Sequence, residues 1–216
     1  MSGPPEAPDS ALFPILAKDP LLMATVPKTV PRLGPDDDGG ILSAEEFAVA
    51  DYLEPWKYER ERGTLIVMPP DGPGHDRGSE PFRDYLGAYR LAHPDRVEEV
   101  VSEAWVRVDD GTDRIGDIGV FLVGPRSAIK RPERVPELMY EIVSPDRESR
   151  ERDYVKKRRE YRALGVLEYV IIDRTRHRAT VQTAEPSGSR KRILRPDDVY
   201  ETPLLPGLAI PLHEIL

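Results

Sequence analysis

Alternating runs of apolar and polar residues predict a protein rich in β-hairpins. Each predicted hairpin has a turn signal between two runs of strand-forming residues. They cover residues 57–68 with a turn near Arg62-Gly63, residues 96–108 and 114–123 around Asp110-Gly111, and residues 176–183 with 189–195.

Two helices are predicted in the first half of the chain. Ser43 followed by Glu46 has the pattern of a capping box, so a helix should run from there to about Leu53. Apolar residues at spacings of four and three predict a second helix near residues 78–92. The preceding letters PPDGPGHD, residues 69–76, are rich in helix and strand breakers and predict a loop.

A strand–helix–strand unit is predicted in the second half. Residues 138–143 have the composition of a buried strand, residues 148–164 that of a charged helix, and residues 166–172 that of a second strand. Such a unit is typical of a crossover between two parallel strands.

The first 40 residues differ in composition from the rest. They hold eight of the 23 prolines and end in GPDDDGG. This composition predicts a flexible, proline-rich arm over residues 1–40, or a loosely attached strap, followed by one domain over residues 41–216. A chain of 216 residues is long enough for one core and such an arm.

Composition narrows the class of protein. The chain has no cysteine, which excludes disulfides and thiolate metal sites. It has no apolar run near the roughly 20 residues of a membrane span. No signal peptide is recognisable at its start, so a cytoplasmic location is predicted.

The net charge of −8 argues against a nucleic-acid partner, but the charge is unevenly distributed. Residues 147–162 hold eight Arg/Lys and four Asp/Glu, a local charge of +4. Residues 174–195 hold seven Arg/Lys and one Glu, a local charge of +6. An acidic total can therefore hide a basic surface, although solvated faces would have the same composition.

Two strands carry a carboxylate among apolar neighbours. Alternation places Glu141 on the face of Met139 and Val143, and it places Asp117 on the face of Ile115 and Phe121. A carboxylate in such surroundings must be paired, bind a metal or take up a proton.

A third candidate carboxylate comes from the neighbouring strand. If Val108 pairs with Arg114 across the predicted hairpin, Glu103 lies on the same face as Asp117.

The charged helix places a lysine on its apolar stripe. Tyr154, Tyr161 and Leu164 define that stripe, and Lys157 falls on it with Asp153 one turn earlier. Lys157 can therefore reach back to the carboxylate of Glu141. The plain alternative is an internal salt bridge between Lys157 and Glu141 or Asp153 that serves packing alone.

Asp117, Glu141 and Lys157 together favour chemistry over packing, because three ionisable groups aimed at one interior point are costly to keep. Two carboxylates suit a hard cation such as Mg²⁺ or Mn²⁺. The bound cation polarises a phosphodiester, and a lysine can orient water or stabilise negative charge on the phosphate.

One segment resembles a known family. Residues 140–173 read YEIVSPDRESRERDYVKKRREYRALGVLEYVIID. This is similar to the signature of the Uma-type restriction endonuclease family, within the PD-(D/E)XK nuclease superfamily. The matching positions are Glu141, Ser144, Pro145, Asp153, Lys157, Tyr161, Gly165, Val166, Glu168 and Tyr169. LSAEEF, YERERGTLIVMPP, His75 and LPGLAIPLHEIL extend the likeness over residues 41–216.

The resemblance implies an α+β fold with a restriction-endonuclease-like core, in which helices flank a mixed central sheet. It also implies a metal-dependent DNA endonuclease. Asp117 and Glu141 would hold the metal, with Lys157 and His75 as further catalytic residues. Asp153 is expected to orient Lys157, Glu103 to assist from nearby, and Tyr161 to pack against the site. Gly116 departs from the family's usual proline, and Val143 stands where the superfamily has its lysine.

Two other functions stay open. A non-catalytic relative would use the same fold for nucleic-acid binding or assembly, which the acidic total favours. A metal-free hydrolase would use Asp117 and Glu141 as acid and base. Lys157 argues against the latter, because a nearby ammonium lowers the pKa of a carboxylate. A homodimer is expected, since nucleases that cut both strands often pair about a two-fold axis.

Overall fold

The computed structural model describes residues 30–70, 72–130, 133–144, 146–186 and 188–216. The strands are β1 (Arg32–Leu33), β2 (Asp51–Tyr52), β3 (Lys57–Glu61), β4 (Thr64–Met68), β5 (Val97–Asp109), β6 (Thr112–Leu122), β7 (Leu138–Ile142), β8 (Glu168–Asp173), β9 (Arg178–Glu185), β10 (Gly188–Leu194), β11 (Val199–Tyr200) and β12 (Ile210–Pro211). The helices are α1 (Ala44–Val49), α2 (Pro73–Ala92), α3 (Arg147–Glu151) and α4 (Arg158–Leu164), with a π-helical turn, η3 (Arg152–Lys157), joining the last two.

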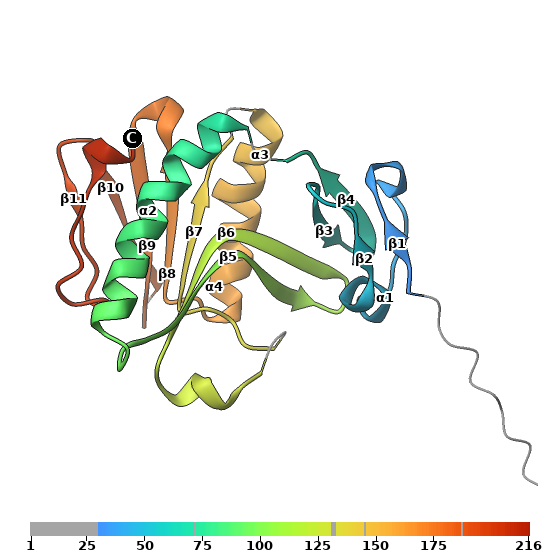
Figure 1. Ribbon diagram of the computed structural model, residues 1–216, viewed down its shortest axis with the longest axis horizontal. Coiled ribbons are helices and arrows are strands. Elements are labelled where there is room, and N and C mark those ends of the chain that lie inside the picture. The colour runs from blue at the N-terminus through green and yellow to red at the C-terminus, as the bar shows by residue number, and fades with distance from the viewer. Residues whose placement is uncertain (1–29, 71, 131–132, 145, 187) are drawn as a thin grey trace, which may run out of the picture.

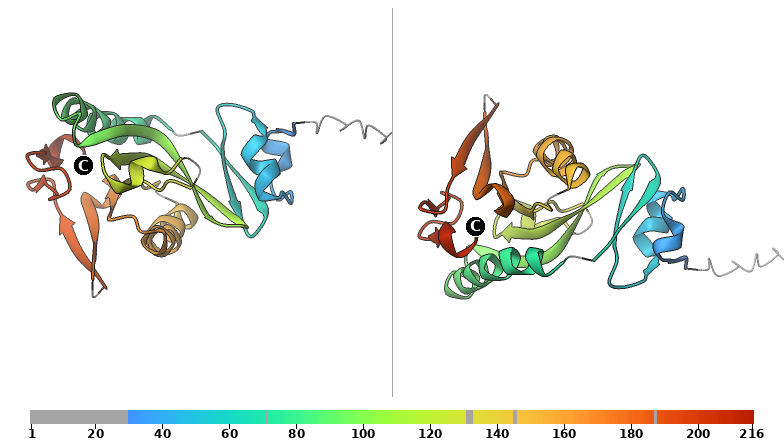
Figure 2. Two further views of the ribbon diagram at one scale, coloured as in Figure 1. Left: turned by 90° about the horizontal axis from the view of Figure 1, so that it is seen from below. Right: turned by 90° about the horizontal axis from the view of Figure 1, so that it is seen from above.

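A mixed eight-stranded sheet forms the centre of the molecule. Seven of its strands follow the order β10-β9-β8-β7-β6-β3-β4, and β5 pairs with β6 outside that path. β7 and β8 run parallel, whereas the other pairs in this sheet are antiparallel. Figures 1 and 2 show α2 on one face of the sheet and the segment from α3 to α4 on the other. The α+β architecture predicted from the sequence is confirmed.

Each face of the sheet has its own core. On the α2 side, Phe82, Leu86 and Tyr89 pack with apolar residues of β6 to β9 and of the C-terminal segment. On the other side, Tyr161 packs against Met139 and Ile171. Two faces covered by helices explain why all five residues of β7 are buried.

A smaller lobe lies beside the main sheet (Figure 1). β1 and β2 pair in parallel, and Leu33, Phe47, Tyr58 and Leu65 form a third core there. The lobe joins the main sheet through β3, which pairs with β6 at Arg60↔Asp113.

The predicted arm, residues 1–40, is only partly within this description. Residues 1–29 lie outside the described residues. Residues 30–40 contribute β1 and a short 3-10 turn, and the side chain of Leu33 in β1 is buried in the small lobe.

All three predicted hairpins are present. β3 and β4 turn at Arg62 and Gly63, whose φ angles are 53° and 83°, a conformation that a tight two-residue hairpin turn requires. The strand–helix–strand unit is also confirmed, because β7 and β8 are parallel and residues 147–164 between them are helical.

Three local predictions were wrong. The helix that begins after Ser43 has its capping box but ends at Val49, because residues 51 and 52 pair with β1. The α2 helix begins at Pro73 inside the predicted loop, since proline suits the first position of a helix. An irregularity between Arg107 and Asp109 shifts the β5–β6 register, so Val106 rather than Val108 pairs with Arg114.

None of the helices in the described part of the chain is long and apolar enough to span a membrane.

A buried polar network ties the C-terminal segment to the sheet. The Tyr200 hydroxyl donates to Glu168 Oε1 at 2.7 Å and lies 3.1 Å from the Tyr140 hydroxyl. Thr183 donates to the other Glu168 oxygen at 2.8 Å. Glu168 is fully buried, so these bonds replace the water that its carboxylate would otherwise bind.

Tyr200→Phe should lower the free energy of unfolding by about 1–3 kcal/mol, because it leaves a buried carboxylate oxygen without its donor. Tyr85→Phe is the matched control, since the Tyr85 hydroxyl bonds Glu214 at an exposed position. Urea unfolding of both variants checks the prediction. Equal losses would show that the buried network carries no special stability.

Candidate active site

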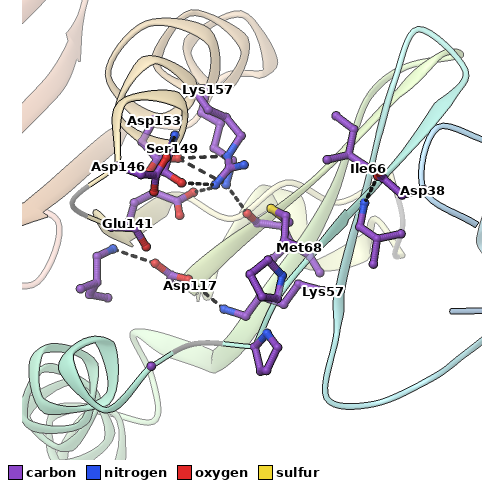
Figure 3. Close-up of a pocket in the computed structure, with 18 residues that line it drawn as sticks. Asp38, Lys57, Ile66, Met68, Asp117, Glu141, Asp146, Ser149, Asp153 and Lys157 are labelled. Atoms are coloured by element: carbon purple, nitrogen blue, oxygen red, sulfur yellow. Dashed lines mark hydrogen bonds and ion pairs between the residues drawn. The ribbon is translucent and has the colours of Figure 1, made fainter. Parts of the chain in front are cut away.

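A polar cleft lies where the main sheet, the small lobe and the charged helix meet (Figure 3). Its volume is about 440 Å³. Its charged residues come from the segment after β1, from strands β3, β6 and β7, from the segment after β7 and from the helix. They are Asp38, Lys57, Asp117, Glu141, Asp146, Arg152, Asp153 and Lys157. Asp117, Glu141 and Lys157, predicted from the sequence to point toward one place, all line this cleft.

Strand pairing brings Asp117 and Glu141 together. The antiparallel pairing of β6 with β7 ends at Ile118↔Tyr140, and the next residue of each strand lines the cleft. The backbone amide of Ile142 donates to Asp117 Oδ2 at 2.7 Å, which fixes the carboxylate in place. Lys57 Nζ lies 3.4 Å from the other oxygen, Oδ1.

Glu141 is a buried carboxylate with two donors on one oxygen. Its Oε1 accepts hydrogen bonds from Lys157 Nζ at 3.1 Å and from the Tyr161 hydroxyl at 3.2 Å. Burial raises the pKa of Glu141 well above its ordinary value, and the negative charge of Asp117 raises it further, while Lys157 lowers it. Lys157 thus lowers this pKa, as expected from the sequence, but the sequence did not reveal that burial outweighs the ammonium.

Lys157 is held by several acceptors at once. Its Nζ donates to the Ile115 carbonyl at 2.6 Å, and it lies 3.0 Å from Glu59 Oε1 and 3.7 Å from Asp153 Oδ1, in addition to its bond to Glu141. Burial alone would lower the pKa of Lys157, but Glu141 and Glu59 together hold it well above its ordinary value. Lys157 is therefore a fixed positive charge at neutral pH and cannot act as a general base.

The π-helical turn η3 spans the residues that point inward. Asp153, its second residue, and Lys157, its last, are both buried, and Tyr161 follows one turn later and is buried too. A π turn is wider than an α turn and is often found at functional sites. The stripe predicted from Tyr154, Lys157, Tyr161 and Leu164 thus faces the sheet, with a charged group inside it.

The sequence reasoning missed Glu59. This residue of β3 is fully buried, and its Oε2 accepts from Arg114 Nη1 at 3.2 Å while its Oε1 accepts from the Ile115 amide at 3.2 Å. Burial raises the pKa of Glu59, but Lys157, Arg152 and Arg114 outweigh that effect and hold it below its ordinary value. The sequence feature that points to Glu59 is the alternation in KYERE, residues 57–61, which puts Lys57 and Glu59 on one face of the strand.

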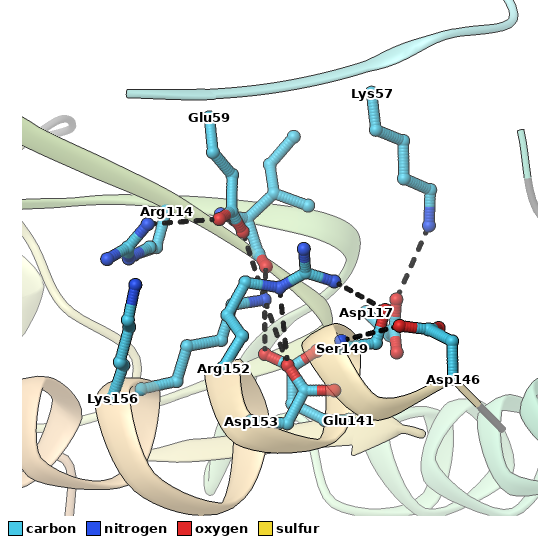
Figure 4. A network of polar contacts seen from close by, with 12 residues as sticks. Lys57, Glu59, Arg114, Asp117, Glu141, Asp146, Ser149, Arg152, Asp153 and Lys156 are labelled. Carbon is cyan, nitrogen blue, oxygen red and sulfur yellow. Dashed lines mark hydrogen bonds and ion pairs between the residues drawn. The ribbon is translucent and has the colours of Figure 1, made fainter. Parts of the chain in front are cut away.

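A network of ion pairs continues outward from Glu59 (Figure 4). Arg114 is buried and contacts Glu160 at 2.9 Å and Glu61 at 3.1 Å, and Lys156 contacts Glu61 at 2.9 Å. These contacts connect β3, β6 and the helix around Lys157. The network therefore positions the elements that form the cleft.

Glu103 and His75 are the two other site residues predicted from the sequence. Glu103 is exposed and does not line the cleft, but its Oε1 lies 3.6 Å from Lys57 Nζ, which does. His75 belongs to the first turn of α2, and its side chain lies outside the described part. Asp146 was not predicted, but it lines the cleft and accepts from the Ser149 amide at 2.8 Å at the start of the helix.

The acidic residues of the cleft fit Mg²⁺ better than a metal that requires many protein ligands. In the described part of the chain, no three or more His, Asp or Glu residues are arranged to hold a metal ion. Mg²⁺ is commonly held by one or two carboxylates, with water and substrate phosphate completing its shell. Asp117 and Glu141 supply two such carboxylates, and both line the cleft.

Comparison with protein families identifies the chain. Residues 44–213 match the model of the Uma2 family, whose description reads "Putative restriction endonuclease". The chain belongs to the Uma2 family. The family resemblance inferred from residues 140–173 is therefore confirmed.

A solved structure agrees with this Uma2 assignment. A protein from Anabaena variabilis, described as a putative nuclease belonging to DUF820, is 16% identical and superposes with a TM-score of 0.64. The match covers 81% of this chain and 97% of the other, and at this identity it shows a shared fold. A search of curated proteins found no match.

One departure from the family pattern has a structural explanation in this Uma2 member. Gly116 stands where the sequence comparison led us to expect proline. A Cβ atom at position 116 would overlap Met139 Sδ on the neighbouring strand β7. Glycine at position 116 thus leaves room for Met139 in the core, and the backbone amide of Ile142 holds the Asp117 carboxylate.

Lys157→Met should lower the free energy of unfolding by about 3–5 kcal/mol without added metal, because Glu141 would stay buried without its cation and Glu59 would lose one of its cationic partners. Lys156→Met is the control on the adjacent residue, whose half-exposed ion pair with Glu61 is worth at most about 1 kcal/mol. Chemical denaturation measures both losses.

A double variant tests whether the buried charges are the cause. Lys157→Met combined with Glu59→Gln should be more stable than the sum of the two single losses implies, since one of the stranded charges is gone. Strict additivity of the two losses would contradict the assignment of Glu59 as a partner of Lys157.

Proposed function

We propose that this protein is a Mg²⁺-dependent DNA endonuclease that hydrolyses phosphodiester bonds. The observation that carries the proposal is the shared cleft of Asp117, Glu141 and Lys157, in which a fixed ammonium touches a buried carboxylate beside a second one. Membership of the Uma2 family supports the same class of activity.

Each charged residue of the cleft would have a distinct role in phosphodiester hydrolysis. Asp117 and Glu141 would hold the metal, which when bound supplies a Lewis acid for the phosphate and activates water. Lys157 carries a permanent positive charge, so it would stabilise the negative charge that develops on the phosphate. Lys57 of β3 borders the same cleft and would contact a phosphate oxygen of the substrate. Tyr161 and Asp153 would keep Glu141 and Lys157 in position.

A non-catalytic role is the second candidate. Lys57 pairs with Asp117 and Lys157 pairs with Glu141, so each carboxylate already has a cationic partner from the chain itself. In a binding or assembly protein these two ion pairs would stay formed and no metal ion would replace the lysines. The metal-free hydrolase is a third possibility, since the raised pKa of Glu141 is the property that a general acid requires.

A plasmid-nicking assay separates these functions. The wild-type protein should convert supercoiled plasmid with Mg²⁺ or Mn²⁺ and lose this activity in EDTA. Glu141→Ala and Asp117→Asn should each lower the rate by roughly a hundredfold or more, because each removes a proposed metal ligand. Asp95→Asn, at an exposed turn, should cut like the wild type.

Three results would decide against the proposal. Cleavage that persists in EDTA would favour the metal-free mechanism. No cleavage and no metal-induced rise in Tm would favour the non-catalytic role. Full activity in Glu141→Ala would remove this cleft from the reaction.

The raised pKa of Glu141 predicts a pH dependence of metal binding. A carboxyl group with a folded-state pKa above its unfolded value contributes stability at low pH, and this contribution is lost as pH rises through the folded pKa. Mg²⁺ competes with the proton for the Glu141 carboxylate, and a bound cation would stabilise the ionised form of this group. The rise in Tm caused by Mg²⁺ should therefore grow as the pH rises above the ordinary carboxyl range.

Thermal melts of the wild type and Glu141→Gln, with and without Mg²⁺, check this expectation. The glutamine variant should show a smaller Mg²⁺ effect with a flatter pH profile. Identical profiles would assign the pH dependence to another group.

The homodimer and the cytoplasmic location stay predictions from the sequence.

A further inference from the structure

A second groove lies between the helical segment and the β9–β10 hairpin. Figure 2 shows these two elements beside one another in both views. The groove has a volume of about 270 Å³ and shares none of its lining residues with the active-site cleft. Most of its lining comes from two segments that are basic in the sequence, residues 147–162 and 174–195, and Val166 and Tyr169 complete it.

The helix contributes three arginines to this groove. Lys157 and Tyr161 face the sheet, so Arg158 and Arg162 stand together on an outer face, one turn apart, with Arg159 beside them. All three side chains are exposed. Four residues of helix correspond to about 6 Å along the axis, so the two side chains are close enough to reach neighbouring phosphate groups of one DNA strand.

The hairpin forms the opposite wall. Gln182 of β9 and Ser189 of β10 line the groove. Lys191 pairs directly with Gln182 across the hairpin and therefore shares its face. The Arg162 guanidinium reaches toward this wall, because its Nη2 lies 3.9 Å from the point that a Cβ of Gly188 would occupy.

The charge of the groove is uncompensated. Its lining includes no carboxylate among the residues that the structure describes. Within that same part of the chain, Arg158, Arg159, Arg162 and Lys191 form no ion pair, in contrast to the paired arginines and lysines of the active-site cleft. Four neighbouring cations repel one another, so an anionic partner would be bound with a gain in stability.

We propose that this groove binds the phosphate backbone of duplex DNA and holds it while the cleft acts on the strand. The inference rests on the proposed function only for the choice of DNA as the polyanion. Arginine has a fork of donors that matches phosphate oxygens, and backbone contacts position a protein on DNA without reading its sequence. Exposed Ser189 and half-buried Gln182 add neutral donors of the kind that accompany such contacts.

The test measures binding of a labelled DNA duplex of about 20 base pairs by fluorescence anisotropy, in EDTA so that no strand is cut. Arg158→Gln/Arg162→Gln should weaken binding by roughly tenfold and reduce the slope of log K against log salt by about 1.8, as expected for two lost phosphate contacts. Arg158→Lys/Arg162→Lys should keep most of that slope, because the charge remains.

The matched control removes two exposed cations outside the groove. Arg96→Gln/Lys130→Gln lowers the net positive charge equally and should leave the slope near that of the wild type. If the slope of log K against log salt falls equally in both double variants, the effect is one of total charge, and the proposal that this groove binds DNA is wrong. All variants should keep the wild-type Tm, since the replaced side chains are exposed.

The outcome is distinguishable from failure of the proposed function. A wild-type protein that binds duplex with the expected slope but never cuts would keep the groove and reject the nuclease. Cleavage by the wild type with unchanged duplex binding in Arg158→Gln/Arg162→Gln would reject the groove alone. Duplex binding unaffected by these substitutions while binding to anionic lipid vesicles is lost would assign the groove to a membrane surface and also overturn the proposal.

Discussion

The ammonium of Lys157 is the point on which the arrangement of the site depends. It lies within 3.1 Å of Glu59 and Glu141 and within 2.6 Å of the Ile115 carbonyl, so it connects β3, β6, β7 and the helix at one atom. Burying two carboxylates without it would cost several kcal/mol. The strands can therefore bring their acidic residues together only because the helix delivers a cation among them.

The ion pairs around Lys157 depend on the apolar cores that pack on the two faces of the sheet. Apolar cores on both faces of the sheet fix β7 and β8, and the buried Tyr200–Glu168 network holds the C-terminal segment against them. This frame sets the register that leaves Asp117 and Glu141 just beyond the last pair of β6 and β7. The acidic residues need no flexible loop to meet, because the end of a strand ladder already places them side by side.

Much of this could be predicted from the sequence. Hairpins with strong turn signals, the parallel strand–helix–strand unit and the lysine on the helical stripe all follow from local periodicity. For Glu59, alternation indicates only that it shares a face with Lys57, because in one dimension it is a polar residue of an ordinary hairpin. Only the single pairing of β3 with β6, between residues distant in sequence, turns Glu59 toward Lys157. The pKa of Glu141 was also beyond the sequence, since its direction depends on how completely the site is buried.

The strand β3 serves two interiors with its two faces. Tyr58 and Arg60 belong to the small lobe, where Arg60 contacts Asp113 at 2.7 Å and the ring of Phe47, while Lys57 and Glu59 serve the cleft. A slip or insertion of one residue would exchange the two sets and disrupt both interiors at once. The length of this short strand is thus subject to two requirements, so its evolution is constrained more tightly than that of the hairpin turn beside it. New specificity would be expected to arise in the surrounding loops and surface grooves rather than in this strand.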